Sequence, residues 1–324
     1  MNDPEDVLRI MQPKPMPFPL MRIGGVQDGA YLVPDDLTGI VACFSPGVAN
    51  RKDFEDELVA RFGIRSHLCD YSSDENSFAT PLKPGMQTFR KQWLDIDGCE
   101  NCVSLEAWVA ELEPSSGDLL LQMDIEGAEY RNLCNCSPGL LARFRVILLE
   151  LHGLEMVNDP TRLKEVLAPL LLLLDQQFVC VHAHPNNVAG AVRFGRTGLN
   201  VPRVHELTFL RRDRLETRES AQFYLPLMPH PEDIEVNVDT VGPLFLSDDW
   251  FVGRQLPAAS RARKHQLLAK FAGHSIDELR RELLDMDDRL YHLERRLDEL
   301  HWISVTVRFI KRIISRFRRL FPAG

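Results

Sequence analysis

Short apolar segments alternate with amphipathic ones through the central part of this chain, and that alternation restricts the fold more than any other feature. Most of the short segments are apolar throughout, as strands are when both faces of a parallel sheet are covered. Strand, helix and strand in repetition predict an α/β fold with helices on both faces of the sheet. The predicted strands are Ile40–Ser45, Arg65–Cys69, Asn101–Leu105, Leu119–Met123, Val146–Leu151, Phe178–Ala183 and Val204–Leu210, and the predicted helices are Asp53–Phe62, Leu105–Leu112, Ala128–Cys134 and Thr161–Gln177.

Polar residues gather where these predicted strands end. The carboxyl ends of parallel strands meet at one edge of a sheet, and open α/β sheets bind their ligands in the crevice at that edge. We therefore expect one ligand site built from several strand ends. The residues concerned are Gly47 after the first strand, Asp70 after the second, Asp124, Glu126 and Glu129 after the fourth, Glu150 and His152 after the fifth, and His182 and His184 after the sixth.

Gly47 and Asp70 form the first pair in this set. A glycine after the first strand permits a tight turn, and an acid about 20 residues later holds the ribose hydroxyls in nucleotide-binding folds. Only one glycine stands in Ser45–Asn50, so the segment cannot form the glycine-rich loop that cradles a pyrophosphate, which disfavours NAD. A plain turn followed by a surface aspartate is the competing interpretation.

The acids and histidines beyond the fourth strand are the candidates for catalysis. Asp124 ends a buried strand and must face ligand or solvent, whereas Glu126 and Glu129 also suit the first turn of a helix. His152 and His182 are candidate general bases, because imidazole titrates near working pH. A divalent ion, Mg²⁺ or Mn²⁺, held by Asp124, Glu150 and His152 is the alternative means of activating a hydroxyl.

The segment before the first strand divides into two parts. Five prolines in residues 1–20 predict an extended arm without a helix. The glycine-rich segment Arg22–Tyr31 follows, and it suits either a simple hairpin or a lid over a ligand.

We divide the chain into four parts: an arm and lid (1–39), the α/β domain (40–257), a linker helix with a coiled coil (258–300) and a basic amphipathic tail (301–324).

The composition excludes some functions. A formal net charge of −9 argues against a nucleic-acid partner, since binding phosphates requires a basic surface. The acidic N-terminus lacks the apolar core of a signal peptide, and the longest apolar run, Ala168–Leu174, is too short to span a bilayer. Seven cysteines are expected to be reduced thiols in a cytoplasmic protein. Zinc bound by Cys99, Cys102, Cys134 and Cys136 is a weaker alternative, because their spacing matches no familiar zinc site.

The C-terminal segment has two patterns. From Ile276 to Leu300 apolar residues recur at spacings of three and four between charged flanks, which predicts a coiled coil and a homo-oligomer. Packing of this helix on its own domain is the alternative. Residues 301–324 carry six basic residues and no acid, with apolar residues on one helical face. That pattern favours an anionic membrane surface, such as the inner face of a membrane, over docking on a partner protein.

The motifs at the predicted crevice resemble those of the FkbM-like S-adenosylmethionine-dependent methyltransferases, in particular a bacterial branch associated with glycan biosynthesis. The similarity extends over about residues 22–250. It rests on an ordered set of segments, of which the Asp-Ile-Glu-Gly-Ala-Glu run is fairly specific. These segments are Arg22–Tyr31, Phe44–Val48, Phe54–Glu55, Asp70–Ser72, Gln122–Tyr130, Glu150–His152, His182–Asn187 and Glu206–Phe209.

The resemblance implies a Rossmann-like class I methyltransferase fold and O-methylation of a sugar hydroxyl or similar small-molecule alcohol. Gly47, Glu55 and Asp70 would line the S-adenosylmethionine pocket, with Asp124 near the transferred methyl group. Gly25 and Asp28 of the glycine-rich lid are also expected to contact the cofactor. Two other functions stay open: a metal-dependent hydrolase built on Asp124, Glu150 and His152, and a non-catalytic oligomerising scaffold.

Overall fold

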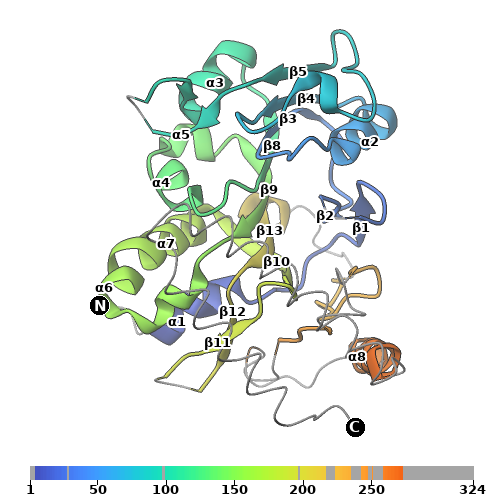
Figure 1. The fold of residues 1–324 in the computed structure, drawn as a ribbon, viewed down its shortest axis with the longest axis vertical. Coiled ribbons are helices and arrows are strands. Elements are labelled where there is room, and N and C mark those ends of the chain that lie inside the picture. Colours follow the sequence, from blue (N-terminus) through green and yellow to red (C-terminus); the bar gives the residue numbers. More distant parts are fainter. Residues whose placement is uncertain are drawn as a thin grey trace, which may run out of the picture.

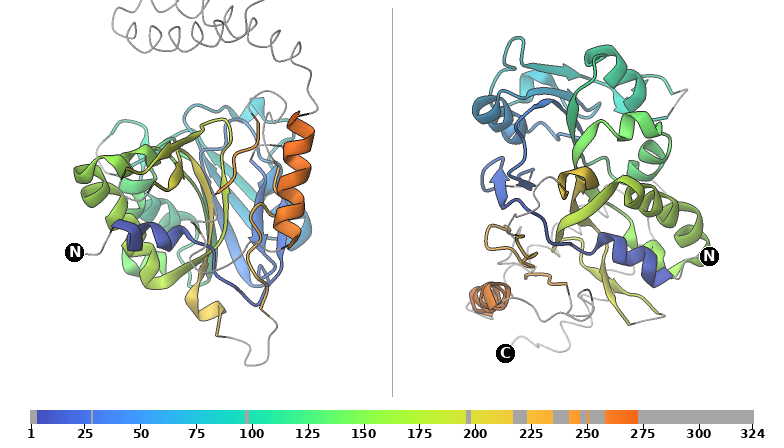
Figure 2. Two further views of the ribbon diagram at one scale, coloured as in Figure 1. Left: turned by 90° about the horizontal axis from the view of Figure 1, so that it is seen from below. Right: turned by 180° about the vertical axis from the view of Figure 1, so that it is seen from behind.

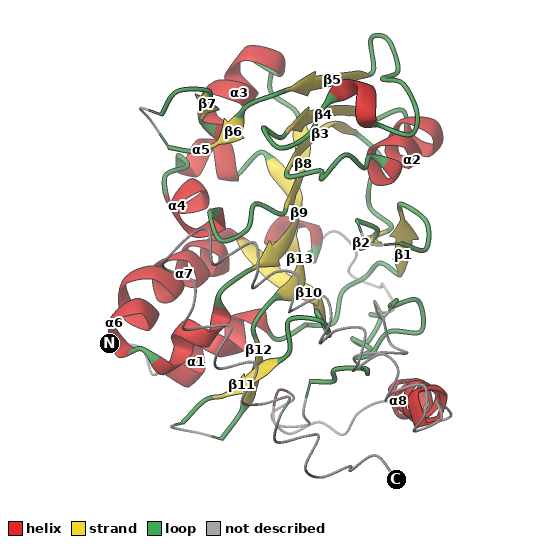
Figure 3. Cartoon of the chain, in the orientation of Figure 1, coloured by secondary structure: helices red, strands yellow, loops and turns green. Residues whose placement is uncertain are grey.

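A seven-stranded sheet forms the centre of the protein in the computed structural model, which describes residues 4–27, 29–96, 99–195, 198–216, 223–234, 242–246, 250 and 258–272 (Figures 1 and 3). The strand order is β10-β13-β9-β8-β3-β4-β5. Six strands are parallel, and β13 runs antiparallel to both neighbours. The prediction of a Rossmann-like α/β fold is confirmed. The strands are β3 (Ile40–Pro46), β4 (Arg65–Cys69), β5 (Gln87–Arg90), β8 (Asp118–Met123), β9 (Phe144–Leu151), β10 (Phe178–Pro185) and β13 (His205–Arg211).

Both faces of this sheet are covered, which explains why its central strands are apolar throughout. Successive side chains of a strand point to opposite faces, so Leu121 of β8 packs in the core on one side and Leu120 in the core on the other. The first core contains Trp108 and the second Leu58. All residues of β9 and β10 are buried.

The helices divide between these two faces (Figure 1). Helices α3, α4 and α7 cover one face, whereas α2 and the β1–β2 hairpin cover the other. The predicted boundaries of α2 and α3 are confirmed to the residue. Ser104 begins α3 by accepting a hydrogen bond from the Ala107 amide, and Gly63 ends α2 with a left-handed φ of 65°. The bounds are β1 Leu20–Ile23, β2 Tyr31–Pro34, α2 Asp53–Phe62, α3 Leu105–Leu112, α4 Glu129–Cys134, α5 Pro138–Leu141, α6 Pro160–Arg162 and α7 Ala168–Gln177, with a π-helical turn at Leu163–Leu167 between the last two.

The predicted third strand of the sheet, Asn101–Leu105, is wrong. Only Cys102–Val103 (β7) is a strand there, and it pairs with Trp93–Leu94 (β6) in a separate two-stranded ribbon. The edge of the main sheet is β5, whose sequence Gln-Thr-Phe-Arg carries little apolar signal. An edge strand has fewer neighbours to pack against, so its sequence can remain polar.

The predicted extended arm is wrong for its first part. Pro4–Leu8 form helix α1, followed by a 3₁₀ turn at Arg9–Met11. Pro4 is tolerated because the first helical residue has no intrahelical partner for its amide. Val7, Leu8 and Met11 are buried in the main core, so packing stabilises a helix too short to form alone.

The proline-rich residues that follow are extended and cover a sheet edge. The Lys14 amide donates to the Cys180 carbonyl of edge strand β10. Met16 forms a β-bridge with Tyr224. A covered edge cannot pair with a second molecule. The N-terminal residues are therefore part of the α/β domain.

Several segments lie around the β10 end of the sheet. Short strands β11 (Ala191–Arg193) and β12 (Asn200–Pro202) form a hairpin. Helix α8 (Ala258–Ala272) lies on the side of the hairpin β1–β2 (Figure 2) and packs on residues 223–234 through Ser260, whose hydroxyl accepts from the Met228 amide. The predicted coiled coil and basic tail lie outside the described residues. No helix within the described ranges is long and apolar enough to cross a membrane.

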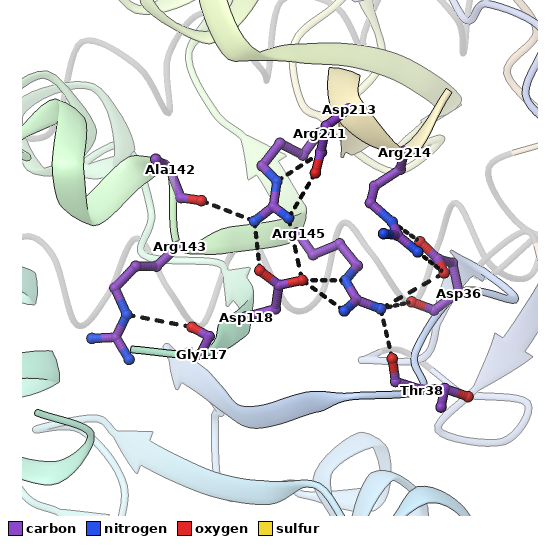
Figure 4. A network of polar contacts seen from close by, with 10 residues as sticks. All are labelled: Asp36, Thr38, Gly117, Asp118, Ala142, Arg143, Arg145, Arg211, Asp213 and Arg214. Atoms are coloured by element: carbon purple, nitrogen blue, oxygen red, sulfur yellow. Dashed lines mark hydrogen bonds and ion pairs between the residues drawn. The ribbon is translucent and has the colours of Figure 1, made fainter. Parts of the chain in front are cut away.

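A network of arginines and aspartates joins the amino ends of the central strands (Figure 4). Arg145 of β9 is buried, and it donates to the Asp118 carboxylate and to the carbonyls of Asp36 and Thr38. Arg211 of β13 also donates to Asp118. Ion pairs therefore hold the amino ends of the central strands together. The predicted site lies at the opposite, carboxyl ends of these strands.

We expect Arg145→Ala to lower the free energy of unfolding by about 3 kcal/mol and Tm by roughly 10 °C, because it removes a buried partner of Asp118 and the donor to the carbonyls of Asp36 and Thr38. The measurement is thermal unfolding by circular dichroism. The control is Arg212→Ala, which removes a half-exposed pair with Asp175 and should cost under about 1 kcal/mol. Equal Tm values for the two variants would contradict this role of Arg145.

Candidate functional site

The turn after β3 touches the end of β8, which brings the predicted site residues Gly47 and Asp124 together. Gly47 has φ 81°, and the Asp124 amide donates to the Pro46 carbonyl at 3.2 Å. A Cβ added at Gly47 would lie 1.5 Å from the Asp124 carbonyl oxygen. Neither backbone can give way at that distance, so glycine is required here by close approach as well as by φ.

The same turn is strained, and Asp70 holds it in place. Ala49 and Asn50 have φ values of 44° and 60°, which non-glycine residues rarely adopt. Oδ2 of Asp70 accepts from the amides of Val48 and Ala49 at 3.1 and 2.9 Å. Ser73 donates to the same carboxylate and accepts from the Asn50 amide. These bonds offset the cost of the left-handed backbone.

Asp70 lies at the carboxyl ends of the strands, as predicted, but both of its carboxylate oxygens already accept hydrogen bonds from this chain. Its other oxygen, Oδ1, accepts from the amide and the hydroxyl of Ser72, both at 2.7 Å. Burial alone would raise the pKa of this carboxyl, yet the hydrogen bonds lower it. A carboxylate offers about four lone-pair sites, and five donors from this chain already use them. Asp70 can therefore act on a ligand by shaping the turn.

Two cavities meet where Gly47, Ala49 and Asp124 line both of them. The larger has about 950 Å³ of empty space and extends toward β6, while the smaller has about 450 Å³ and extends under the β1–β2 hairpin. The other residues of the larger cavity are Cys69, Asp70, Ser72, Gln92, Trp93, Leu94, Asp95, Ile125, Glu126, Gly127, Ala128 and Arg131. Those of the smaller are Gly29, Tyr31, Val48, Arg51, Lys52, Asp53, Glu55 and Gln122.

The larger cavity has an aromatic wall. The Trp93 side chain is 48% exposed and lies 5.2 Å from the ring of Tyr71, which is 38% exposed. On the same wall Arg131 donates to both oxygens of Asp95 at 2.6 and 2.7 Å. Gly127 has φ 98° and open space where a Cβ would stand, so a ligand can approach its backbone closely. This wall suits a flat aromatic ligand.

The smaller cavity is polar and contains Glu55, one of the predicted residues. Glu55 lies in the first turn of α2 and is buried, which raises its pKa to about 7, although a hydrogen bond with Ser45 acts in the opposite direction. Gln122 donates to the Tyr31 hydroxyl at 3.0 Å, so the hairpin is tied to the sheet at this point.

The glycine-rich segment forms the turn of the β1–β2 hairpin, beside the smaller cavity. The Gly24 amide donates to Glu57 of α2, and Arg22 donates to the Gly25 carbonyl. Gly29 lines the smaller cavity, whereas Gly25 does not. Asp28 lies outside the described residues. The lid interpretation is thus compatible with the hairpin's position, and the two predicted cofactor contacts at Gly25 and Asp28 stay predictions.

Asp124 and His152 lie next to each other, and a buried acid supports the ring. Nε2 of His152 is 3.8 Å from Oδ1 of Asp124 and 3.4 Å from the exposed Glu126. Nδ1 is 3.2 Å from Oε1 of Glu129 and 3.0 Å from the Glu150 carbonyl. Glu129 is fully buried. Burial and the nearby charge of Glu150 raise the pKa of Asp124. The pKa of His152 is also raised: burial alone would lower it, but the hydrogen bond with Glu129 outweighs that effect.

Glu129 is the functional candidate that sequence reasoning undervalued. Its Oε1 accepts from the amides of Ile125 and Gly127, both at 3.1 Å, so it caps the turn that presents Asp124. The predicted metal set of Asp124, Glu150 and His152 differs from the observed grouping at one position. Asp124, Glu129 and His152 each offer a ligand atom within 4.8 Å of the others, whereas Oε1 of Glu150 accepts from Asn186.

His182 lines a third cavity of about 400 Å³, together with Arg22 and Glu206. Its Nε2 is 3.0 Å from Asp233, and Nδ1 of His184 is 3.5 Å from the other oxygen of that carboxyl. Burial would raise the pKa of Asp233, but the two histidines hold it well below its usual range. This cavity shares Gly29 and Tyr31 with the smaller cavity. His182 therefore belongs to a neighbouring part of the same edge, away from His152.

Neither Trp93 nor Asp233 could be identified from the sequence, because both lie on segments outside the main strands. The cysteines also differ from expectation. Cys99 and Cys102 form a disulfide, so they do not join Cys134 and Cys136 in a zinc site. Cys134 is exposed and Cys136 is buried.

No family model and no curated protein matches this sequence. The function is therefore argued from the side chains themselves. Two cavities share Gly47, Ala49 and Asp124; Trp93 lines one, buried Glu55 lines the other, and the carboxylate–imidazole cluster of Asp124 and His152 lies where they meet. These groups can contact a flat ring, bind a cationic group and accept a proton.

We expect Glu55→Gln to change how stability depends on pH. Because the folded pKa of about 7 exceeds the unfolded value of about 4.3, the folded protein holds a proton that the unfolded chain has lost. The stability of the native protein should therefore fall as pH rises through this window. The variant lacks this loss, so its Tm should exceed that of the native protein by several degrees at pH 8 and match it near pH 4.

The matched control is Glu75→Gln, which changes an exposed carboxylate and should leave the Tm difference constant with pH. A pH-independent difference for Glu55→Gln would show that burial of this carboxyl does not govern its protonation.

Proposed function

We propose that this protein is an S-adenosylmethionine-dependent methyltransferase that methylates a hydroxyl group of a glycan or glycolipid. The observation that carries the proposal is the junction at Gly47 and Asp124, where the cavity with the aromatic wall meets the polar cavity. S-adenosylmethionine is elongated, with adenosine at one end, an amino acid at the other and the methyl group between them. In this proposal its parts would occupy the two cavities in that order.

The architecture supports this assignment. A mostly parallel seven-stranded sheet with one reversed strand agrees with the class I methyltransferase fold that the FkbM-like resemblance implies. The motif residues Gly47, Glu55 and Asp124 line the cleft. Fold alone does not determine function, so the weight rests on how these residues are arranged.

The larger cavity would hold the adenosine. The face of Trp93, which lines this cavity, can stack on a purine, and such stacking contributes about 1–3 kcal/mol per base. Ser72 and Asp95 lie on the same wall for the ribose hydroxyls. Asp70 acts indirectly, because it fixes the turn at residues 47–50 against which the ribose would lie.

The smaller cavity would hold the amino-acid part. Glu55 is the acid that would face the ligand's ammonium group, and a bound cation would favour its ionised form. Gly29 leaves open space beside its backbone, so the chain can approach the ligand closely there. The methyl group would then lie beside Asp124.

Methyl transfer to a hydroxyl needs loss of the acceptor proton. S-adenosylmethionine supplies an electrophilic methyl group; the acceptor oxygen bonds to its carbon as the carbon–sulfur bond breaks and sulfur takes the electron pair. Asp124 and His152 would hold the hydroxyl in line with this carbon, which is a major source of acceleration. The proton would leave into their cluster. Polar residues of the third cavity, including His182 and Glu206, would contact the remainder of a sugar.

We expect purified protein to bind S-adenosylhomocysteine in isothermal titration. Trp93→Ala should weaken that binding about tenfold, since a stacking face is lost. The control is Phe223→Ala, which removes a similarly exposed ring outside the three cavities and should leave the affinity unchanged. Absence of heat at high micromolar ligand would contradict the proposed function.

We expect Asp124→Asn to reduce methyl transfer by about 100-fold, because a preorganised charge at the reacting atoms is lost. The assay incubates the protein with labelled S-adenosylmethionine and a glycan-lipid extract and identifies the labelled product. S-adenosylhomocysteine binding and Tm should change little. Undiminished transfer by the variant would remove Asp124 from the reaction.

A further inference from the structure

The cluster beside the proposed methyl position contains buried oxygen atoms that accept no hydrogen bond from the described residues. Glu129 is fully buried, and its Oε2 accepts no hydrogen bond from any described residue. Oδ1 of Asp124 is also buried and receives no hydrogen bond within the described part of the chain. A buried carboxylate oxygen without a donor is costly, so each of these oxygens calls for a ligand.

The unpartnered oxygens belong to residues that converge. Ligand atoms of Asp124, Glu129 and His152 lie within 4.8 Å of one another. Glu129 is held rigidly for this purpose, since its Oε1 is fixed by the Ile125 and Gly127 amides and leaves Oε2 free for another partner. A proton on one carboxyl would satisfy one oxygen, whereas an ion satisfies both at once.

We infer that Asp124, Glu129 and one ring nitrogen of His152 bind a divalent cation, and that this ion activates the acceptor hydroxyl. Two carboxylates with one imidazole suit Mn²⁺, because carboxylates favour Mg²⁺ and Mn²⁺ whereas imidazole favours the transition metals. Three protein ligands leave positions open for a substrate oxygen. Asp124 lines both cavities of the cleft, so those positions face the proposed methyl group.

This inference rests on the proposed function and specifies how the proton is lost. A hydroxyl bound to the ion has a lowered pKa, and its proton passes to water, to which the cluster opens at the exposed Glu126. The deprotonated acceptor oxygen would carry out the attack described above. His152 would then act as a ligand, and water would accept the proton in place of a general-base side chain.

The experiment measures binding of Mn²⁺ alone by the loss of the electron paramagnetic resonance signal of free Mn²⁺. We expect the metal-stripped native protein to bind one ion, and Glu129→Gln to weaken binding by about tenfold or more. The control is Glu155→Gln, which changes an exposed carboxylate outside the three cavities and should bind within about threefold of the native protein. Circular dichroism confirms that each variant is folded.

Two results would overturn the inference: no Mn²⁺ binding by the native protein, or equal binding by Glu129→Gln. Titration of S-adenosylhomocysteine into the same metal-stripped protein separates this inference from the proposed function. Nucleoside binding without Mn²⁺ binding would reject the ion alone. Mn²⁺ binding without nucleoside binding would reject the methyltransferase and leave a metal-dependent hydrolase at the same cluster.

Discussion

The contact between the Gly47 turn and the Asp124 backbone is the constraint on which the site depends. It joins the ends of β3 and β8, so that Gly47 and Asp124 line both cavities. The contact requires a glycine, and the turn beyond it takes two non-glycine residues into left-handed conformations. Asp70 compensates through hydrogen bonds to the turn. Strain of this kind persists where surrounding structure enforces it, and it is common at ligand sites.

Buried charge is distributed unevenly between the two ends of the sheet. At the amino end, Arg145 and Asp118 neutralise each other and stabilise the strands. At the carboxyl end, Asp124, Glu129 and Glu150 stand close together around the single imidazole of His152. Such an excess of acid costs stability, and a bound cation would balance it. The paired charges thus keep the amino end of the sheet rigid, while the acids at the carboxyl end can act on a ligand.

The structure brings several of the predicted site residues to one end of the sheet. Gly47, Asp70, Asp124 and His152 do share one edge, because parallel strands deliver their carboxyl ends together. The roles predicted for two of the acidic residues, Glu129 and Asp70, differ from the contacts that these residues make. Glu129 was interpreted as a helix-dipole residue, yet it supports His152; Asp70 was expected to meet the ribose, yet its oxygens bind the chain itself. Sequence spacing does not say which way a side chain turns.

Periodicity alone determined the α/β class, six of the seven strands of the sheet, with boundaries close to those observed, and the helices α2 and α3. Burial on both faces leaves a local apolar signal in such strands. Tertiary structure decided the rest. Edge strand β5 and helix α1 carry weak local signals and form because neighbours pack on them. The aromatic wall at Trp93 and the Asp233 contact to His182 join residues far apart in the chain. Their position follows from folding of the whole domain, which no local pattern encodes.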